Sequence, residues 1–290
     1  MIDAHHHIWR QSDLPWLLGP EQPRIFGPYA AIKRDYMIEE YLRDLDGTGI
    51  KGSVYVQANW APNWALDEAA WVAAEAARVG WPMAIVAYAD MTRFDCAEQL
   101  EKLADIPGVV GIRHQFHWHE NPLYRFAVRD DLCDDTLVQD NVARLAKHGF
   151  SFDLQVFPGQ MAGAVRLANS SPDVTFVLQH VGMLEDHSKA GRKAWLDGLS
   201  ALAACKNVTC KLSGLGTFIH KNDPEHIKDQ VKTALKLFGP DRCLFGSNYP
   251  IEKLWTSYSD LWAAYQDAVP KAHRNQVFTK TAARIYRLAI

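Results

Sequence analysis

The sequence predicts an α/β protein with the (β/α)8 architecture of a TIM-like barrel, and three observations support this prediction. Short apolar runs rich in β-branched residues alternate with stretches of helical periodicity along the whole chain. Eight strand–helix units follow one another, which fits a closed ring of parallel strands better than an open sheet. The length of 290 residues suits one barrel, and we therefore expect a single domain over 1–290.

The expected elements follow in chain order, each justified by its apolar pattern. The predicted strands are 2–9, 54–59, 83–90, 109–114, 151–156, 175–182, 208–214 and 243–248. The predicted helices are 36–46, 66–79, 95–105, 137–148, 160–170, 192–204, 224–238 and 257–268. A last helix, 272–288, is expected to pack across the barrel and close the chain.

Two connections, 10–35 and 115–136, are long, and both follow a predicted strand. Barrel enzymes build specificity from loops at the carboxyl ends of their strands, so we expect both at the active-site face. The alternative is that they only decorate the surface. Their aromatic residues and those nearby could form a pocket lid or ordinary core and interface: Trp9, Trp16, Phe26, Trp60, Trp64, Phe116 and Trp118.

The composition indicates which kinds of binding partner the protein is expected to have. The net charge is −3 and no basic run occurs, which argues against nucleic acid as the main partner. No apolar stretch is long enough to cross a membrane, and the first strand leaves no room for a signal peptide. The five scattered cysteines fit reduced, buried thiols. We therefore expect a cytoplasmic protein that acts on a small molecule, with a homodimer as one expected assembly.

Polar residues end several strands where a purely structural barrel would have apolar ones. In the first strand His5 and His7 share a face, while His6 points the other way, because side chains alternate along a strand. Two imidazoles on one face can hold one metal ion or one substrate oxygen. His180 ends the sixth strand and is a candidate ligand or base, the alternative being a buried histidine bonded to a backbone carbonyl.

The fourth strand ends in Arg113 and His114. A guanidinium that points into a barrel mouth must pair with an anion, either a neighbouring carboxylate or a carboxylate of the substrate. Lys211 in the seventh strand could bind a substrate oxygen or pair with Asp153 of the fifth strand. Other polar residues at the strand ends are Tyr55, Gln57, Asn59, Gln155, Ser213, Asn248 and Glu252. Buried polar groups in a barrel often only bond one another, but their convergence at one rim favours a functional site.

Five segments of the sequence then carry a resemblance to a known family. They are IDAHHHIW at 2–9, GIRH at 111–114, the strand-ending His180, KLSG at 211–214 and FGSNYP at 245–250. Together they resemble the amidohydrolase superfamily over essentially the whole chain, and within it the lactonase-like branch of sugar-lactone and pyrone-dicarboxylate lactone hydrolases. The resemblance implies a barrel of the metal-dependent-hydrolase type. It also implies that His5, His7 and His180 line a mononuclear metal site, which some lactonase members use without a metal.

Asn248 departs from the family pattern, which implies a water-activating Asp at the end of the eighth strand. A neutral amide cannot accept a proton as a carboxylate does, and it removes a negative metal ligand. Three consequences are open. The metal is absent or weakly bound, the general base moves to His180 or Glu252, or the protein binds a ligand without turnover.

The sequence therefore predicts a lactonase-type hydrolase that opens a sugar-acid or carboxylated lactone by water attack at the carboxyl ends of the strands. In this hypothesis His5 and His7 polarise the carbonyl, directly or through one Zn²⁺ or Mn²⁺ ion that the three histidines hold. His180 activates water, with Asn248 and Glu252 beside it. The expected substrate-binding residues are Gln57, Arg113, His114, Gln155 and Lys211. The alternatives are metal-independent lactone hydrolysis, a metal-dependent decarboxylase and a non-catalytic sugar-acid-binding barrel.

Overall fold

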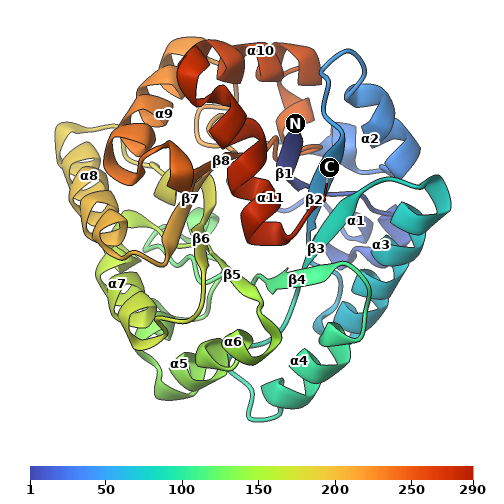
Figure 1. The fold of residues 1–290 in the computed structure, drawn as a ribbon, viewed down its shortest axis with the longest axis vertical. Helices are drawn as coiled ribbons and strands as arrows, with labels where there is room; N and C mark the ends of the chain where they lie inside the picture. Colours follow the sequence, from blue (N-terminus) through green and yellow to red (C-terminus); the bar gives the residue numbers. More distant parts are fainter. Residues whose placement is uncertain (290) are drawn as a thin grey trace.

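Eight parallel strands form one ring in the computed structural model, which describes residues 1–289. The strands pair in sequence order, each with the next along the chain. Their bounds are β1 Ile2–His6, β2 Gly52–Val56, β3 Met83–Ala87, β4 Val109–Ile112, β5 Ser151–Leu154, β6 Phe176–Leu178, β7 Val208–Leu212 and β8 Cys243–Phe245. Figure 1 shows the helices arranged around this ring, so the predicted barrel is confirmed.

The ring closes between the first and last strands, at their carboxyl ends. The backbone N–H of Asn248 donates to the carbonyl of His5 at 2.7 Å, and that of His7 donates to the carbonyl of Tyr249 at 2.7 Å. Asp3 reinforces this seam, because its carboxylate accepts from the backbone and hydroxyl of Ser247 at 2.8 and 2.7 Å. The seam therefore fixes where Asn248 lies relative to the histidines of β1.

The helices between the strands match most of the predicted ranges. Their bounds are α1 Pro15–Leu18, α2 Ile38–Asp44, α3 Ala65–Val79, α4 Cys96–Ala104, α5 Thr136–Ala143, α6 Leu145–His148, α7 Met161–Ser170, α8 Lys189–Ala204, α9 Pro224–Phe238 and α10 Tyr258–Ala268. The predicted helix 137–148 is divided at Arg144 into α5 and α6. The predicted helix 272–288 is a 3₁₀ turn at Lys271–His273, a π-helix at Gln276–Lys280 and α11 at Thr281–Tyr286, because the wider π turn interrupts regular α-helical bonding.

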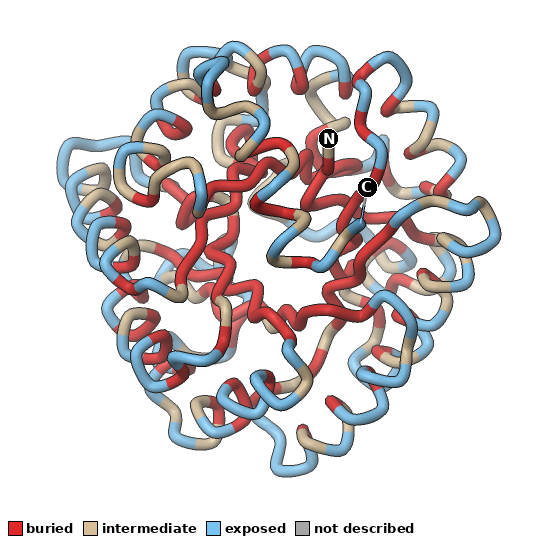
Figure 2. The backbone as a smooth tube through the Cα atoms, in the orientation of Figure 1, coloured by how far each residue is buried: buried red, intermediate tan, exposed pale blue. Residues whose placement is uncertain are grey.

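The last helix packs across the barrel, as the sequence predicted, and it does so at the amino ends of the strands. Ala282 and Tyr286 of α11 join a buried cluster with Ile2, Val54 and Leu244 of the strands. Figure 1 shows α11 lying over the ring, and Figure 2 shows that the ring is buried while the outer helical surfaces are exposed. This end of the barrel is therefore plugged, which leaves the carboxyl ends for a site.

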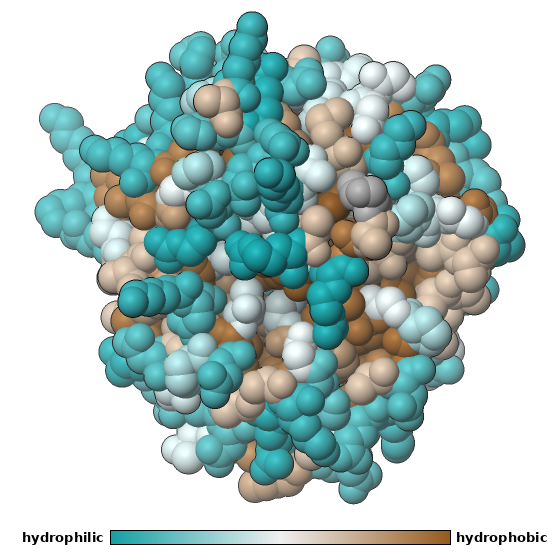
Figure 3. All heavy atoms as spheres, in the orientation of Figure 1, coloured by the Kyte–Doolittle hydropathy of each residue, from teal (hydrophilic) through white to brown (hydrophobic). Residues whose placement is uncertain are grey.

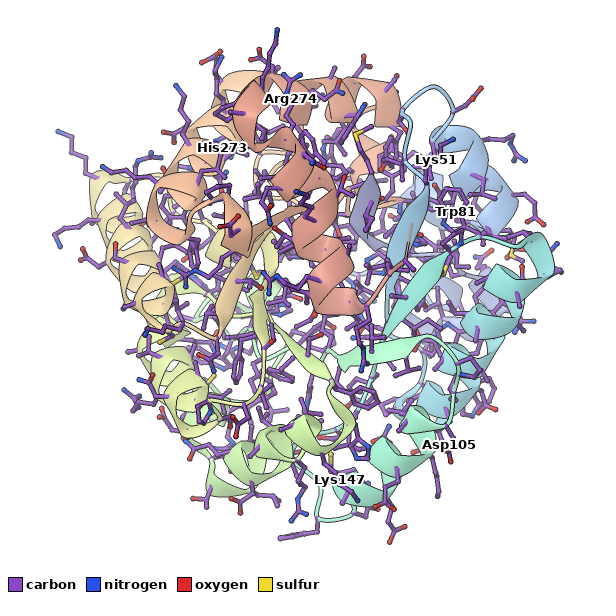
Figure 4. The ribbon with its side chains drawn as sticks, in the orientation of Figure 1. Lys51, Trp81, Asp105, Lys147, His273 and Arg274 are labelled. Atoms are coloured by element: carbon purple, nitrogen blue, oxygen red, sulfur yellow. The ribbon has the colours of Figure 1, made fainter. Side chains whose placement is uncertain are left out.

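The face that α11 covers is the amino-terminal face. The residues labelled in Figure 4 include Lys51, Asp105 and Lys147, which come shortly before β2, β4 and β5. In Figure 3 hydrophilic side chains cover much of this face, both at its rim and across its middle, with hydrophobic atoms showing between them. Among the described residues, no helix combines the length and apolarity that a bilayer crossing needs.

Candidate active site

A cavity of about 430 Å³ lies at the carboxyl ends of the strands. Each of the eight strands is followed, within three residues of its end, by a residue that lines the cavity: His7, Gln57, Tyr88, Arg113, Gln155, His180, Gly214 and Asn248. Among the described lining residues there is neither an aspartate nor a glutamate. The polar strand ends that the sequence pattern singled out therefore meet around one space.

The structure brings six of the ten predicted site residues to the cavity wall. These are His7, Gln57, Arg113, Gln155, His180 and Asn248. Four others do not line it: His5, His114, Lys211 and Glu252. His114 lies to one side, where its Nδ1 accepts from the backbone N–H of Met91 at 3.2 Å and lies 3.7 Å from a carboxylate oxygen of Asp90. Substrate contacts by His114 and Lys211 stay predictions.

Three histidines lie next to one another at the site: His7 and His180 line the cavity, and His5 contacts both without lining it. The ring centre of His5 is 5.1 Å from that of His7 and 4.9 Å from that of His180. Both ring nitrogens of His5 are buried without a hydrogen-bond partner among the described residues. His6 points away, stacked on Tyr41 with ring centres 3.9 Å apart. The prediction that His5 and His7 share a face opposite to His6 is confirmed.

His7 and His180 line the cavity wall, and the hydrogen bond that each makes through Nδ1 determines whether its Nε2 can accept or donate a proton. His7 Nδ1 lies 2.6 Å from the carbonyl oxygen of Val56. Because a carbonyl only accepts, this nitrogen carries the ring proton, and Nε2 is left with a lone pair. Burial, with the charge of Arg113 second, holds the pKa of His7 well below its usual range, so the ring is neutral. His7 can thus accept a proton at Nε2, and the carbonyl-polarising role that the sequence assigned to it stays a prediction.

His180 has its Nδ1 3.0 Å from the hydroxyl of Ser213, which leaves Nε2 for the cavity. Burial, assisted by the charges of Arg113 and Lys211, lowers its pKa to about 3. A buried imidazole flanked by two cations stays uncharged at neutral pH. His180 can therefore exchange a proton with a bound water or present an N–H to a substrate oxygen.

The three histidines offer neutral nitrogen donors of the kind that Zn²⁺ prefers. Within residues 1–289, however, no group of three or more His, Cys, Asp or Glu side chains is arranged to hold one metal ion. Asn248 also supplies a neutral amide in place of a carboxylate. The residues as arranged do not fit a metal centre, and the chemistry derived below is assigned to the side chains alone.

Asn248 and Glu252 form the eighth-strand part of the site. Glu252 is 1% exposed and accepts a hydrogen bond from the indole N–H of Trp255 at 2.8 Å. Burial raises its pKa to about 8, although Trp255 and Asn248 act to lower it. Its carboxyl group is therefore mostly protonated at pH 7. Glu252 as a general base stays a prediction, while Asn248 reaches the cavity directly.

Backbone strain is concentrated around the cavity. Asn59, His180, Met183 and Asn248 line it with positive φ angles between 54° and 64°. Val181, beside His180, has φ 50°, which a β-branched residue rarely adopts. Strained conformations of this kind persist where the surrounding structure forces them, and they cluster at functional sites.

Arg113 is a buried cation that has no ion-pair partner among residues 1–289. Its side chain is 3% exposed, it donates to the carbonyl of Gln57, and its Nε has no partner. No carboxylate lies within ion-pair distance of it in residues 1–289. Asp153 instead pairs with Lys211 at 2.7 Å, the second of the two alternatives that the sequence left open for Lys211. Burial lowers the pKa of Arg113 to about 10, because nearby carboxyls offset only part of the desolvation.

Both long loops reach the cavity, as predicted. Segment 10–35 supplies Pro15, Trp16, Arg24, Ile25 and Phe26, and segment 115–136 supplies Gln115 and Phe126. Of the seven aromatic residues considered for the walls, Trp9, Trp16, Phe26 and Trp60 line the cavity, whereas Trp64, Phe116 and Trp118 do not. Sequence reasoning did not single out Arg24, Gln115 or Thr217 as site residues. An arginine between two loop aromatics, Trp16 and Phe26, was the available signal for Arg24.

Comparison of the chain with known proteins shows which proteins it resembles. Residues 2–288 match the family described as amidohydrolase. An L-fucono-1,5-lactonase of Burkholderia multivorans is 30% identical, with 99% of this chain and 96% of that protein covered. The protein y4mH of Sinorhizobium fredii is 31% identical, with 99% and 98% covered. A Burkholderia multivorans amidohydrolase crystallised with bound zinc is 27% identical, with a TM-score of 0.81 and 99% of each chain covered.

Proposed function

We propose that this protein, which belongs to the amidohydrolase family, hydrolyses the ester bond of a small polar lactone in the cavity at the carboxyl ends of its strands. The single observation that carries the proposal is the meeting of His7, His180 and Asn248 with Arg113 at one cavity wall. Relatives named L-fucono-1,5-lactonase, at 27% and 30% identity over nearly the whole chain, support the reaction type.

Lactone opening needs a proton acceptor for water, and His7 supplies one. Its Nε2 lone pair accepts a proton as the water oxygen bonds to the carbonyl carbon, while Nδ1–H stays on the carbonyl of Val56. His180 is the second acceptor of the pair, oriented by Ser213. When the ring C–O bond breaks, the proton passes to the departing ring oxygen, and the product is a hydroxy acid.

Developing charge on the carbonyl oxygen needs hydrogen-bond donors. Asn248 at the wall has an amide NH₂ that donates, which a carboxylate at this position could not do. Gln57 and Arg113 add further donors, and the Nε2 of Gln57 and the Nε of Arg113 are both buried without partners. Because a lactone is a reactive ester, several modest donors are sufficient for its opening.

The relative crystallised with zinc supports testing a metal, but the arrangement of ligands described above does not favour one here. For the same reason we favour hydrolysis over the metal-dependent decarboxylase, which requires a firmly held ion. A non-catalytic binding barrel would lack the paired proton acceptors, His7 and His180, at the cavity wall.

The test is a hydrolysis screen. Purified protein is mixed with sugar-acid lactones and carboxylated lactones in weak buffer, and proton release is followed with and without a chelator. We expect acid formation above the spontaneous rate, and its loss in His7→Gln at unchanged stability. If no lactone in either class is opened, the proposal is wrong.

A further inference from the structure

Segment 10–35 places a second arginine at the cavity, and no described carboxylate pairs with it. Arg24 lines the cavity and is half-buried. Its Nε is buried without a hydrogen-bond partner, and within residues 1–289 no carboxylate lies within ion-pair distance of it. Its guanidinium lies 5.8 Å from the ring centre of Trp16. Buried polar atoms in folded proteins are nearly always satisfied, so an orphaned donor at a cavity wall marks a position for a ligand atom.

The loop that carries Arg24 is anchored at several points. The indole N–H of Trp16 donates to the carbonyl of Ala58 at 3.0 Å. The carbonyl of Ile25, next to Arg24, lies 3.0 Å from Nε2 of His220. Gly27 has φ 74°, and a Cβ there would come within 3.0 Å of the same imidazole. These contacts anchor the loop that carries Arg24 and so keep this residue at the cavity wall.

The wall around Arg24 is aromatic. Trp16 and Phe26 flank it in the loop, with ring centres 6.2 Å apart, and Phe126 and Phe218 line the same cavity. A neutral sugar lactone would present hydroxyl groups to these rings and leave both arginines without an anion. A ligand with a carboxylate beside an apolar substituent would pair the carboxylate with the guanidinium and bury the apolar substituent against the aromatic rings.

We propose that the substrate is an anionic lactone that carries an exocyclic carboxylate and an apolar substituent, and that Arg24 is the residue that selects it. The inference rests on the proposed lactone hydrolysis and names its substrate class. Arg24 contacts the carboxylate at the cavity mouth, while Arg113 lies deeper, beside the reacting ring. With two arginines and no acidic residue among the described lining residues, the cavity attracts anions.

The test measures binding apart from turnover. The probes are trans-2-phenylcyclopentane-1-carboxylate, which has no ester bond, and its neutral carboxamide, titrated calorimetrically into the full-length protein. We expect the carboxylate to bind at least about tenfold more tightly, the effect of one charge-assisted hydrogen bond. In Arg24→Gln this preference is lost, and in Arg24→Lys part of it returns because the charge is kept.

Arg125 provides the matched control. It is also a loop arginine over an indole, 4.8 Å from the ring centre of Trp118, but its nitrogens donate to the carbonyls of His119 and Glu120 and it does not line the cavity. Arg125→Gln should keep the full preference. Equal binding of the two probes, failure of the carboxylate to bind, or a preference that survives Arg24→Gln overturns the inference. Proton release from a phenyl-substituted butyrolactone carboxylate is scored separately, so its absence contradicts the proposed function and leaves the binding result standing.

Discussion

Two buried cations, Lys211 and Arg113, lie in the same barrel and are treated by the fold in opposite ways. Lys211 is fully buried in β7 and pairs with Asp153 at 2.7 Å. The same carboxylate accepts from the hydroxyl of Tyr286 at 3.0 Å and from the amide of Gln179 at 2.9 Å. Arg113 directly after β4 is almost as buried, yet no carboxylate of residues 1–289 lies within ion-pair distance of it and its Nε has no partner.

The difference separates a structural charge from a functional one. A buried cation whose anion comes from another strand stabilises the fold, because each charge offsets the desolvation of the other. A buried cation without such an anion costs stability in the free protein and is compensated only when a ligand supplies the charge. Lys211 is therefore a structural charge, whereas Arg113 is a charge left for a ligand to pair with.

The largest expected effect comes from breaking the structural pair. Asp153→Asn leaves the ammonium of Lys211 buried without an anion, and we expect the free energy of unfolding to fall by about 3–5 kcal/mol. Chemical denaturation measures this loss. The double variant Asp153→Asn/Lys211→Met removes both charges and should recover most of it. A loss below about 1 kcal/mol in the single variant would mean that the pair is not structural.

Arg113→Met is expected to lower turnover without lowering stability, which is the opposite of the effect expected for Asp153→Asn. Removing an uncompensated buried charge should leave the free energy of unfolding unchanged or raise it, since Met keeps much of the volume. Turnover of an anionic lactone should fall by about one to two orders of magnitude in kcat/KM, the effect of losing charge-assisted hydrogen bonds to the substrate. Denaturation and kinetics on the same preparation test both. If Arg113→Met destabilised the protein as much as Asp153→Asn, Arg113 would be a structural charge like Lys211.

Sequence patterns predicted the parts of this comparison that depend on strand register. Alternation placed His5 and His7 on one face and His6 on the other, and the strand ends predicted the rim that contains Gln57, Arg113 and His180. Contacts between distant segments could not be predicted in the same way, because no local pattern specifies which carboxylate a buried cation meets. For Lys211 the sequence left two partners open, a substrate oxygen and Asp153. Arg24 was missed because a loop has no periodic pattern that would indicate where its side chains point.

Glu68 is one of the carboxyls whose charge acts on Arg113 without pairing with it. It accepts from the Tyr55 hydroxyl at 2.7 Å and from the backbone of Ala58 at 2.5 Å, and burial raises its pKa from 4.5 to about 7. Between these values the unfolded chain loses its proton first. The associated stability is thus present below pH 4.5 and is lost as the pH rises through about 7.

We therefore expect the unfolding free energy of the wild type to fall relative to Glu68→Gln over that pH window, by on the order of 2 kcal/mol. Denaturation of both proteins at several pH values measures the difference. A difference that does not vary with pH would show that Glu68 is charged throughout, and so available as a counter-ion to Arg113.

The smallest expected effect is that of metal removal. The comparison assigns the positive charge of the cavity to its arginines, and a divalent ion held by His5, His7 and His180 would add to that charge. Because no three-ligand group is arranged among the described residues, dialysis against a chelator should leave kcat/KM unchanged.

Asn248→Asp is the matched control: its φ of 59° is tolerated by Asp as well as Asn, and the variant restores a negative ligand. Elemental analysis should then find more zinc in the variant than in the wild type. Loss of wild-type turnover on chelation, with recovery on added Zn²⁺, would instead show that the histidines close around an ion, and the charge that binds the substrate would no longer belong to Arg113 and Arg24 alone.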